Sequence, residues 1–268
     1  MRENRYHKDP QERLIQTIMT SFDIEKVGQL QNPVPRPNWA PSPCSACPVR
    51  HLTVCAALDE AELAQMSAIV TTLELSPGDP LFDEGEPADH LFNVTAGAVK
   101  VYKLLADGRR QMTGFLFAGD FLGLAKQETY AYSAEAIIHT ALCRFPRRKL
   151  ERLLEKYPKM GHRLLGMASH ELAVAQEQML LLGRKTAREK IASFLLMLSR
   201  RATQRGQAGD PVLVPMSRND IGDFLGLTTE TVSRTFTRLK QGGSIHLLQG
   251  GKVALSDRAR LESIAEGI

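Results

Sequence analysis

The hydrophobic and polar positions divide the chain into segments with different periods. From about residue 73 to 124, short runs of β-branched and aromatic residues are separated by turn signals such as Pro77-Gly78, Asp107-Gly108 and Gly119. Short runs broken about every 8–12 positions are typical of antiparallel strands in a roll or barrel. The segment therefore predicts an antiparallel β-roll, either packed inside or enclosing a ligand pocket.

A regular helical period follows from about residue 158 to 185. Its apolar positions recur at alternating spacings of three and four residues: Leu165, Ala168, Leu172, Ala175, Met179 and Leu182. We call these six residues the seam. So narrow a stripe is the pattern of a two-stranded coiled coil, whereas a helix buried within one domain usually has a broader apolar face. The seam predicts a homodimer interface, with burial inside a single domain as the alternative. Its two alanines bury little area, so the association need not be strong.

The last module contains two short helical patterns joined by a tight turn. Ser217 and Asp220 predict a capping box at the start of the first helix. Gly226 permits the turn, and Thr228 is a suitable N-cap for the second helix. Two apolar runs at 245–248 and 253–255 flank a pair of glycines and predict a hairpin. Together these elements predict a winged helix-turn-helix.

One face of the second helix carries the chemistry of a major-groove reader. Arg pairs with guanine, Glu accepts from cytosine, and Ser contacts a base or a phosphate. The candidate DNA-binding residues are Thr229, Glu230, Ser233, Arg234 and Arg238. A solvated polar face on an ordinary helix hairpin is the alternative. A reader of this kind works as a two-fold dimer on two half-sites, and the seam would supply that symmetry.

Charge and composition support this division of the chain. Residues 184–268 hold 14 Lys and Arg against 8 Asp and Glu, a net charge of +6, within a chain whose formal net charge is +4. A basic C-terminal third is expected of a nucleic-acid-binding module. No apolar run reaches the ~18–20 residues that a membrane span needs, and the start lacks the apolar core of a secretory signal. We therefore expect a soluble protein of a reducing cytoplasm, with no membrane partner.

These patterns predict an α+β fold in four parts. The parts are a flexible leader at 1–43, a cysteine segment and β-roll at 44–157, the dimerisation helix at 158–185 and the winged helix-turn-helix at 186–268. The leader contains an amphipathic pattern near 14–22, followed by a proline-rich stretch. Asp59 and Glu62 predict a helix start after the cysteines. No nucleophile–base pair or phosphate-binding loop is found, so no enzymatic activity is predicted.

The cysteines are concentrated in one short segment. Cys44, Cys47 and Cys55 lie within twelve positions, and Cys143 stands alone at the end of the predicted roll. In a reducing compartment, such thiols favour metal or redox chemistry over disulfides. Four thiolates satisfy either a structural zinc ion or a [4Fe–4S] cluster, and spacing does not separate the two. Free or redox-switching thiols are a third possibility.

The order of β-roll, long helix and winged helix-turn-helix resembles the Crp/Fnr family of bacterial transcription regulators, whose roll is the cyclic-nucleotide-binding jelly roll. The segment Glu230-Thr231-Val232-Ser233-Arg234 matches the E-x-x-S-R motif of the FNR branch. That match implies binding to palindromic TTGAT-N4-ATCAA sites. The choice of this DNA sequence rests mainly on Ser233. By the same resemblance, the loop Asp107-Gly108-Arg109-Arg110 contacts RNA polymerase, with a plain hairpin turn as the alternative.

The cysteine spacing also resembles that of the FnrL/FnrN members of the family. There, a C-x2-C-x7-C segment and a distant fourth cysteine hold an oxygen-labile [4Fe–4S] cluster. The resemblance implies an oxygen-responsive regulator of anaerobic genes with Cys44, Cys47, Cys55 and Cys143 as ligands. A family member with structural zinc or redox-active thiols that responds to another ligand is the alternative. An enzyme regulatory subunit would leave the recognition motif unexplained.

Two departures from the family pattern change the expected signal. The cyclic-AMP branch binds its ligand through Gly-Glu-Leu and Arg-Ser-Ala, where this chain has Gly123-Leu124-Ala125 and Tyr132-Ser133-Ala134. A cyclic phosphate buried without its guanidinium is poorly compensated, so no cyclic nucleotide is expected. The FNR branch also has an Asp in the dimer helix where this chain has Ala175. A change of helix orientation, or of protein turnover, is therefore an alternative to oxygen-driven monomerisation.

Overall fold

The computed structural model describes residues 44–123 and 128–268. The predicted leader at 1–43, with its amphipathic pattern near 14–22, lies outside the described residues, and so do Leu124 and Ala125. The cysteine segment forms two short 3-10 helices, η2 (Arg50–Leu52) and η3 (Val54–Ala57), followed by α2 (Glu60–Ser67). The Asp59 carboxylate accepts from the Glu62 N–H, and Glu62 accepts from the Asp59 N–H, both at 2.9 Å. This reciprocal cap confirms the predicted helix start.

The roll consists of two four-stranded antiparallel sheets. One sheet has the order β1 (Thr71–Leu75), β8 (Thr140–Pro146), β3 (His90–Ala96), β6 (Phe121–Leu122). The other has the order β2 (Pro80–Phe82), β7 (Ser133–Ala136), β4 (Ala98–Leu104), β5 (Arg110–Phe117). Phe82 stacks on both Phe92 and Tyr130 between the sheets, where Val94, Val99 and Leu142 are fully buried. Side chains therefore fill this part of the interior.

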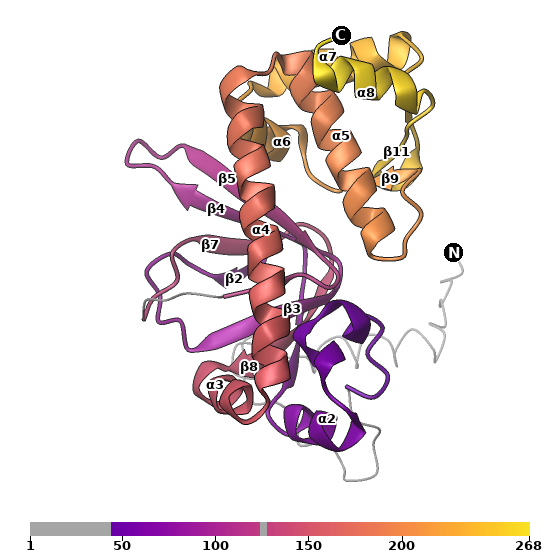
Figure 1. Ribbon diagram of the computed structural model, residues 1–268. Coiled ribbons are helices and arrows are strands. Elements are labelled where there is room, and N and C mark those ends of the chain that lie inside the picture. Colours follow the sequence, from indigo (N-terminus) through magenta and orange to yellow (C-terminus); the bar gives the residue numbers. More distant parts are fainter. Residues whose placement is uncertain (1–43, 124–127) are drawn as a thin grey trace, which may run out of the picture. The chain divides into compact units, whose positions relative to one another are not determined.

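Two further helices connect the roll to the C-terminal module: α3 (Arg147–Lys156) and the 27-residue α4 (Pro158–Arg184). Figure 1 shows α4 running alongside the strands of the roll. The face of α4 that carries Leu164, Met167, Val174 and Leu181 is turned toward the rest of the chain and is partly or fully buried. In the described ranges, no helix is both long and apolar enough to cross a membrane.

The C-terminal module is a winged helix-turn-helix with a supporting helix before it and another after it. Its elements are α5 (Ala187–Gln204), β9 (Val212–Leu213), α6 (Arg218–Leu225), α7 (Thr229–Gln241), β10 (His246–Leu247), η4 (Gln249–Gly251), β11 (Lys252–Ala254) and α8 (Arg258–Glu266). Strands β10, β11 and β9 form one small antiparallel sheet, which is the wing. The predicted α+β class and the order of roll, long helix and winged helix-turn-helix are confirmed.

The roll and the C-terminal module share a hydrophobic core. Met112 and Phe115 of β5 are 1% exposed and belong to the same cluster of buried residues as α5, α6 and α7. The Phe115 ring lies 5.0 Å from the ring centroid of Phe224 in α6 and 6.2 Å from that of Phe194 in α5. Full burial of one such side chain contributes about 1.5–3 kcal/mol. The packing therefore holds the helix-turn-helix against the β4–β5 hairpin.

Candidate functional site

The four cysteines line one small cavity. Cys44, Cys47 and Cys55 approach it from the turns and 3-10 helices of the N-terminal segment, and Cys143 approaches from the middle of β8. The rest of the lining is Arg50, Thr53, Asn93 and Phe145. None of these cysteines is joined to another by a disulfide in the described chain. The fold thus brings together all four residues that the sequence marks as candidate ligands.

The donor set fits a thiolate-ligated centre. Four thiolates are the soft ligands that zinc and iron–sulfur clusters take. Within the described ranges, no three His, Cys, Asp or Glu side chains are placed to hold one metal ion. A single zinc ion needs every sulfur within about 2.3 Å of one point, whereas a cluster binds each thiolate through a separate iron. The four cysteines that line the cavity supply the number of thiolates that either centre requires.

Burial keeps at least two of these thiols protonated. It raises the pKa of Cys143 to about 12, and the neighbouring cysteines raise it further. Burial also raises the pKa of Cys55 to about 11, although a hydrogen bond involving Thr53 and the charge of Arg50 oppose that rise. The thiolate is the form that binds metal, so assembly of a metal centre here must release protons. A rise in pH would therefore favour such assembly.

The cysteine segment is attached directly to the start of α4. Arg163 of α4 donates from Nε to the carbonyl oxygen of Thr53 at 2.5 Å and from Nη2 to that of His51 at 2.6 Å. The Thr53 hydroxyl in turn accepts a hydrogen bond from the Cys55 N–H, and this contact caps the start of η3. The seam begins at Leu165, two residues after Arg163. These hydrogen bonds therefore join the cysteine segment to α4 just before the seam.

Most of the seam is exposed on the single chain. Leu165, Leu172 and Met179 are 61–69% exposed. Ala168 and Ala175 are also exposed, whereas Leu182 is half-buried and shares a cavity lining with Phe224. A row of large apolar side chains left in water is a feature of interaction surfaces. Leu180, which is 70% exposed and lies beside the seam, was not identified by the periodicity.

The helix-turn-helix is built from local capping interactions. The Ser217 hydroxyl accepts from the Asp220 N–H at 3.0 Å, and Asp220 accepts from the Ser217 N–H at 3.1 Å. Gly226 ends α6 in the left-handed region with φ 63°, a conformation that glycine adopts at little cost. The Thr228 hydroxyl then caps α7 by accepting from the Thr231 N–H at 3.1 Å. Each of these contacts follows the sequence prediction.

Helix α7 turns its polar face outward. Val232, Phe236 and Leu239 are buried against the module. The outward residues are all exposed: Thr229, Glu230, Ser233, Arg234 and Arg238. Glu230 and Arg234 form an exposed ion pair at 2.6 Å. Such a pair contributes only about 0.3–0.5 kcal/mol, so the Arg234 guanidinium can be redirected to a base at little cost.

A neighbouring polar residue was missed by the sequence reasoning. Asn219 is exposed on α6, and its side-chain oxygen accepts from the Thr229 hydroxyl at 3.1 Å. This contact joins the first helix of the motif to the N-terminus of α7. No periodic or capping signal marks Asn219, because the contact depends on the angle between the two helices.

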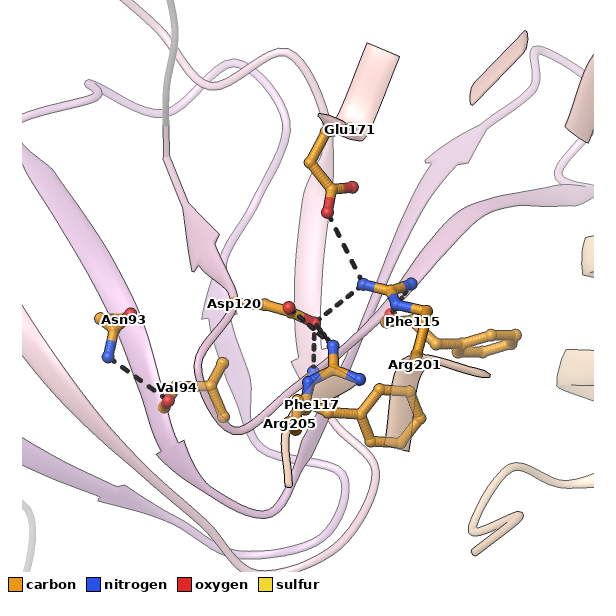
Figure 2. Close-up of polar contacts among 8 residues, drawn as sticks. All are labelled: Asn93, Val94, Phe115, Phe117, Asp120, Glu171, Arg201 and Arg205. Atoms are coloured by element: carbon orange, nitrogen blue, oxygen red, sulfur yellow. Dashed lines mark hydrogen bonds and ion pairs between the residues drawn. The ribbon is translucent and has the colours of Figure 1, made fainter. Parts of the chain in front are cut away.

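A second set of ion pairs connects the roll to α5, as Figure 2 shows. Asp120, in the turn between β5 and β6, accepts from Arg201 at 2.9 Å and from Arg205 at 2.6 Å. Arg201 also donates to the carbonyl oxygen of Phe115 at 3.2 Å and lies 3.7 Å from Glu171 of α4. The side chains of Asp120, Arg201 and Arg205 are only 11–14% exposed. One carboxylate therefore joins the roll to α5, the helix that supports the helix-turn-helix.

Removal of the Asp120 carboxylate should destabilise the fold. Asp120→Ala leaves two mostly buried guanidinium groups without their principal partner, and breaking such a pair costs about 3–5 kcal/mol. Glu84→Ala is the matched control, because Glu84 forms an exposed ion pair with Lys103 at 2.6 Å and should change stability by less than about 1 kcal/mol. Urea unfolding measures both. Equal small losses for the two variants would contradict a structural role for Asp120.

Comparison with known proteins places the whole arrangement among DNA-binding regulators. The model of the cyclic nucleotide-binding domain matches residues 72–157, and that of the Crp-like helix-turn-helix domain matches residues 189–264. The chain is 42% identical to the nitrogen fixation regulation protein FixK of Bradyrhizobium diazoefficiens over 222 residues, 83% of this chain and 93% of that protein. It is 40% identical to the transcriptional activator protein FnrL of Cereibacter sphaeroides, covering 81% and 90% of the two chains. The structure of FixK2 from Bradyrhizobium japonicum superposes with a TM-score of 0.68 at 39% identity, covering 73% of this chain and 97% of that one.

Proposed function

Because this chain belongs to the Crp/Fnr family of transcription regulators, we propose that it is an oxygen-responsive member that uses a [4Fe–4S] cluster to control its binding to DNA. The observation that carries the proposal is the meeting of four cysteines in one cavity next to α4. Four thiolates complete the ligand set of such a cluster. The cluster would supply a centre that reacts with oxygen, which an inert zinc ion does not.

The DNA side of the proposal rests on α7. Exposed on its outer face, Glu230, Ser233 and Arg234 match the E-x-x-S-R motif of the FNR branch, which reads TTGAT half-sites. A homodimer formed through the seam would present two copies of α7 to a TTGAT-N4-ATCAA palindrome. The hairpin loop at 107–110, in which residues 107–109 are exposed, would contact RNA polymerase. The protein would act in the cytoplasm on genes expressed without oxygen.

The chain's own residues connect the two sides. With the cysteine side chains fixed in their cavity, the carbonyl groups of His51 and Thr53 remain where Arg163 can donate to them. Arg163 then holds the first turns of α4 in one position relative to the roll, and the seam follows directly. When the cysteine segment is released, that restraint is lost. A bias of a few kcal/mol changes the balance between two helix arrangements by orders of magnitude.

Anaerobic purification tests the proposal. We expect a brown protein with about four iron and four sulfide per chain. It should bind TTGAT-N4-ATCAA tightly, bind a scrambled duplex of the same composition weakly, and lose the specific binding in air. Cys47→Ser and Cys143→Ser should each reduce the iron content and the oxygen response together. A colourless, zinc-containing protein with binding unchanged in air would contradict oxygen sensing and favour a zinc-stabilised regulator of another ligand, while leaving DNA binding intact.

A further inference from the structure

One buried side chain in the cysteine cavity lacks the hydrogen bond that it needs. Asn93 of β3 is 4% exposed. Among the described residues, its Oδ1 is the single buried side-chain oxygen or nitrogen with no hydrogen-bond partner. Its Nδ2 donates to the Val94 carbonyl oxygen at 3.4 Å, a long contact that Figure 2 draws. A buried polar group without a hydrogen-bond partner is destabilising, so its presence calls for a functional reason.

The strand register places Asn93 beside Cys143. The two residues are directly paired between β3 and β8, and Thr72 of β1 is paired with Cys143 on its other side. Residues paired in this way lie on the same face of the sheet, with Cβ atoms about 4.5–5.5 Å apart. Both side chains line the cavity that also contains Cys44, Cys47 and Cys55. The carboxamide is thus buried at the position where the thiols meet.

The other polar groups of this cavity already have partners. The Arg50 guanidinium donates to the Leu58 carbonyl oxygen at 2.6 Å. The Thr53 hydroxyl donates to the Arg50 carbonyl oxygen at 3.1 Å and accepts the Cys55 N–H. These contacts fix the fold of the cysteine segment. Asn93 differs because its carboxamide has capacity left over for a group inside the cavity.

We propose that Asn93 is a positioning residue for the cysteine-bound cluster, to which its amide donates a hydrogen bond. The inference rests on the proposed function. Thiolate and sulfide sulfurs accept hydrogen bonds and donate none, so the amide must present its N–H groups to them. The amide nitrogen has two N–H groups, and one of them donates to the Val94 carbonyl oxygen over 3.4 Å, so the second can donate to a sulfur in the cavity. Hydrogen bonds to the sulfurs raise the reduction potential and slow attack by oxygen, because they stabilise the more negative state.

Asn93→Leu separates this role from a structural one, because the two make opposite predictions for the metal-free chain. Leu has nearly the same shape and no polar atoms, so the metal-free variant should melt about 2–4 °C higher once the unpaired oxygen is removed. The loaded variant should lose its cluster in air about tenfold faster and have a lower reduction potential. Asn93→Asp, which adds a negative charge and donates nothing, should assemble less cluster. If Asn93 were purely structural, Asn93→Leu would instead lower the melting temperature of the metal-free chain.

The control is Thr95→Val, which removes a hydroxyl two residues further along β3 that donates to the Ala141 carbonyl oxygen at 3.0 Å. It should leave the decay rate and the potential unchanged. The iron and sulfide content of the unaltered protein distinguishes the two possible failures. If that protein holds its cluster and Asn93→Leu changes neither decay rate nor potential, the role of Asn93 is wrong while the proposed function stands. If the unaltered protein holds no cluster, both are wrong.

Discussion

Leu172→Glu is expected to leave the chain folded but monomeric, and to abolish binding to the palindromic site at concentrations where the unaltered protein binds. Leu172 lies near the middle of the seam and is 61% exposed on the single chain, so the folded monomer loses little packing. In a two-fold helix pair, this position faces its own copy. The substitution removes two buried leucines, about 3–6 kcal/mol, and sets two carboxylates against each other. The dissociation constant of the dimer should rise at least roughly 100-fold.

Ala173→Glu is the matched control. Ala173 is the next residue, is exposed, and lies off the seam, so the same carboxylate should be tolerated there. Sedimentation of both variants at several concentrations measures the monomer–dimer balance, and a thermal melt checks that each is folded. DNA mobility shifts then measure binding to the palindrome, which contains both half-sites. If Leu172→Glu remained dimeric and bound DNA, the seam would not be the interface.

The local elements of this fold could be predicted from the sequence. The helix-turn-helix was found because each of its signals lies within three or four residues of its partner: Ser217 with Asp220, and Thr228 with Thr231. The long helix α4 could be predicted because its period persists over many turns. Strands β7 and β8 and helix α3 were not identified. Residues 133–156 contain no glycine to divide strand from strand or strand from helix.

The polar contacts that give the site its character were missed for a different reason. Asn93 lies in the run Leu91–Val94, which is buried on both faces because the cysteine segment covers one side of β3 and the roll interior the other. An alternation of apolar and polar residues, which would reveal the solvent-facing side of a strand, is therefore missing in this run. Arg163 finds its partners 110 or more positions away in the sequence, and the arginines that pair with Asp120 are 81 or more positions away. Their roles follow from tertiary packing, which one sequence does not display. The sequence marked the four cysteines as candidates, but only the register of β8 brings Cys143 to the other three.

The sharpest test of whether α7 recognises the DNA sequence is Arg234→Ala. A bidentate contact between Arg and guanine is worth about 1–3 kcal/mol, and a dimer makes it twice, so affinity for TTGAT-N4-ATCAA should fall roughly 30-fold or more. Folding should hardly change, because the exposed pair with Glu230 contributes only about 0.3–0.5 kcal/mol. Arg234→Lys keeps the charge but loses the bidentate geometry, and most of the specific affinity should still be lost.

Arg200→Ala provides the matched control for that change, because Arg200 is 59% exposed on α5 and pairs with Glu177 at 3.9 Å rather than with any residue of α7. Fluorescence anisotropy at one fixed salt concentration compares the palindrome with a duplex in which the guanine of each half-site is replaced. Arg234→Ala should bind the two duplexes almost equally, whereas Arg200→Ala should still discriminate between them. If Arg234→Ala instead weakened both duplexes by the same factor, Arg234 would be a phosphate contact. The specificity would then have to come from Glu230 and Ser233, because phosphate contacts fix register without reading bases.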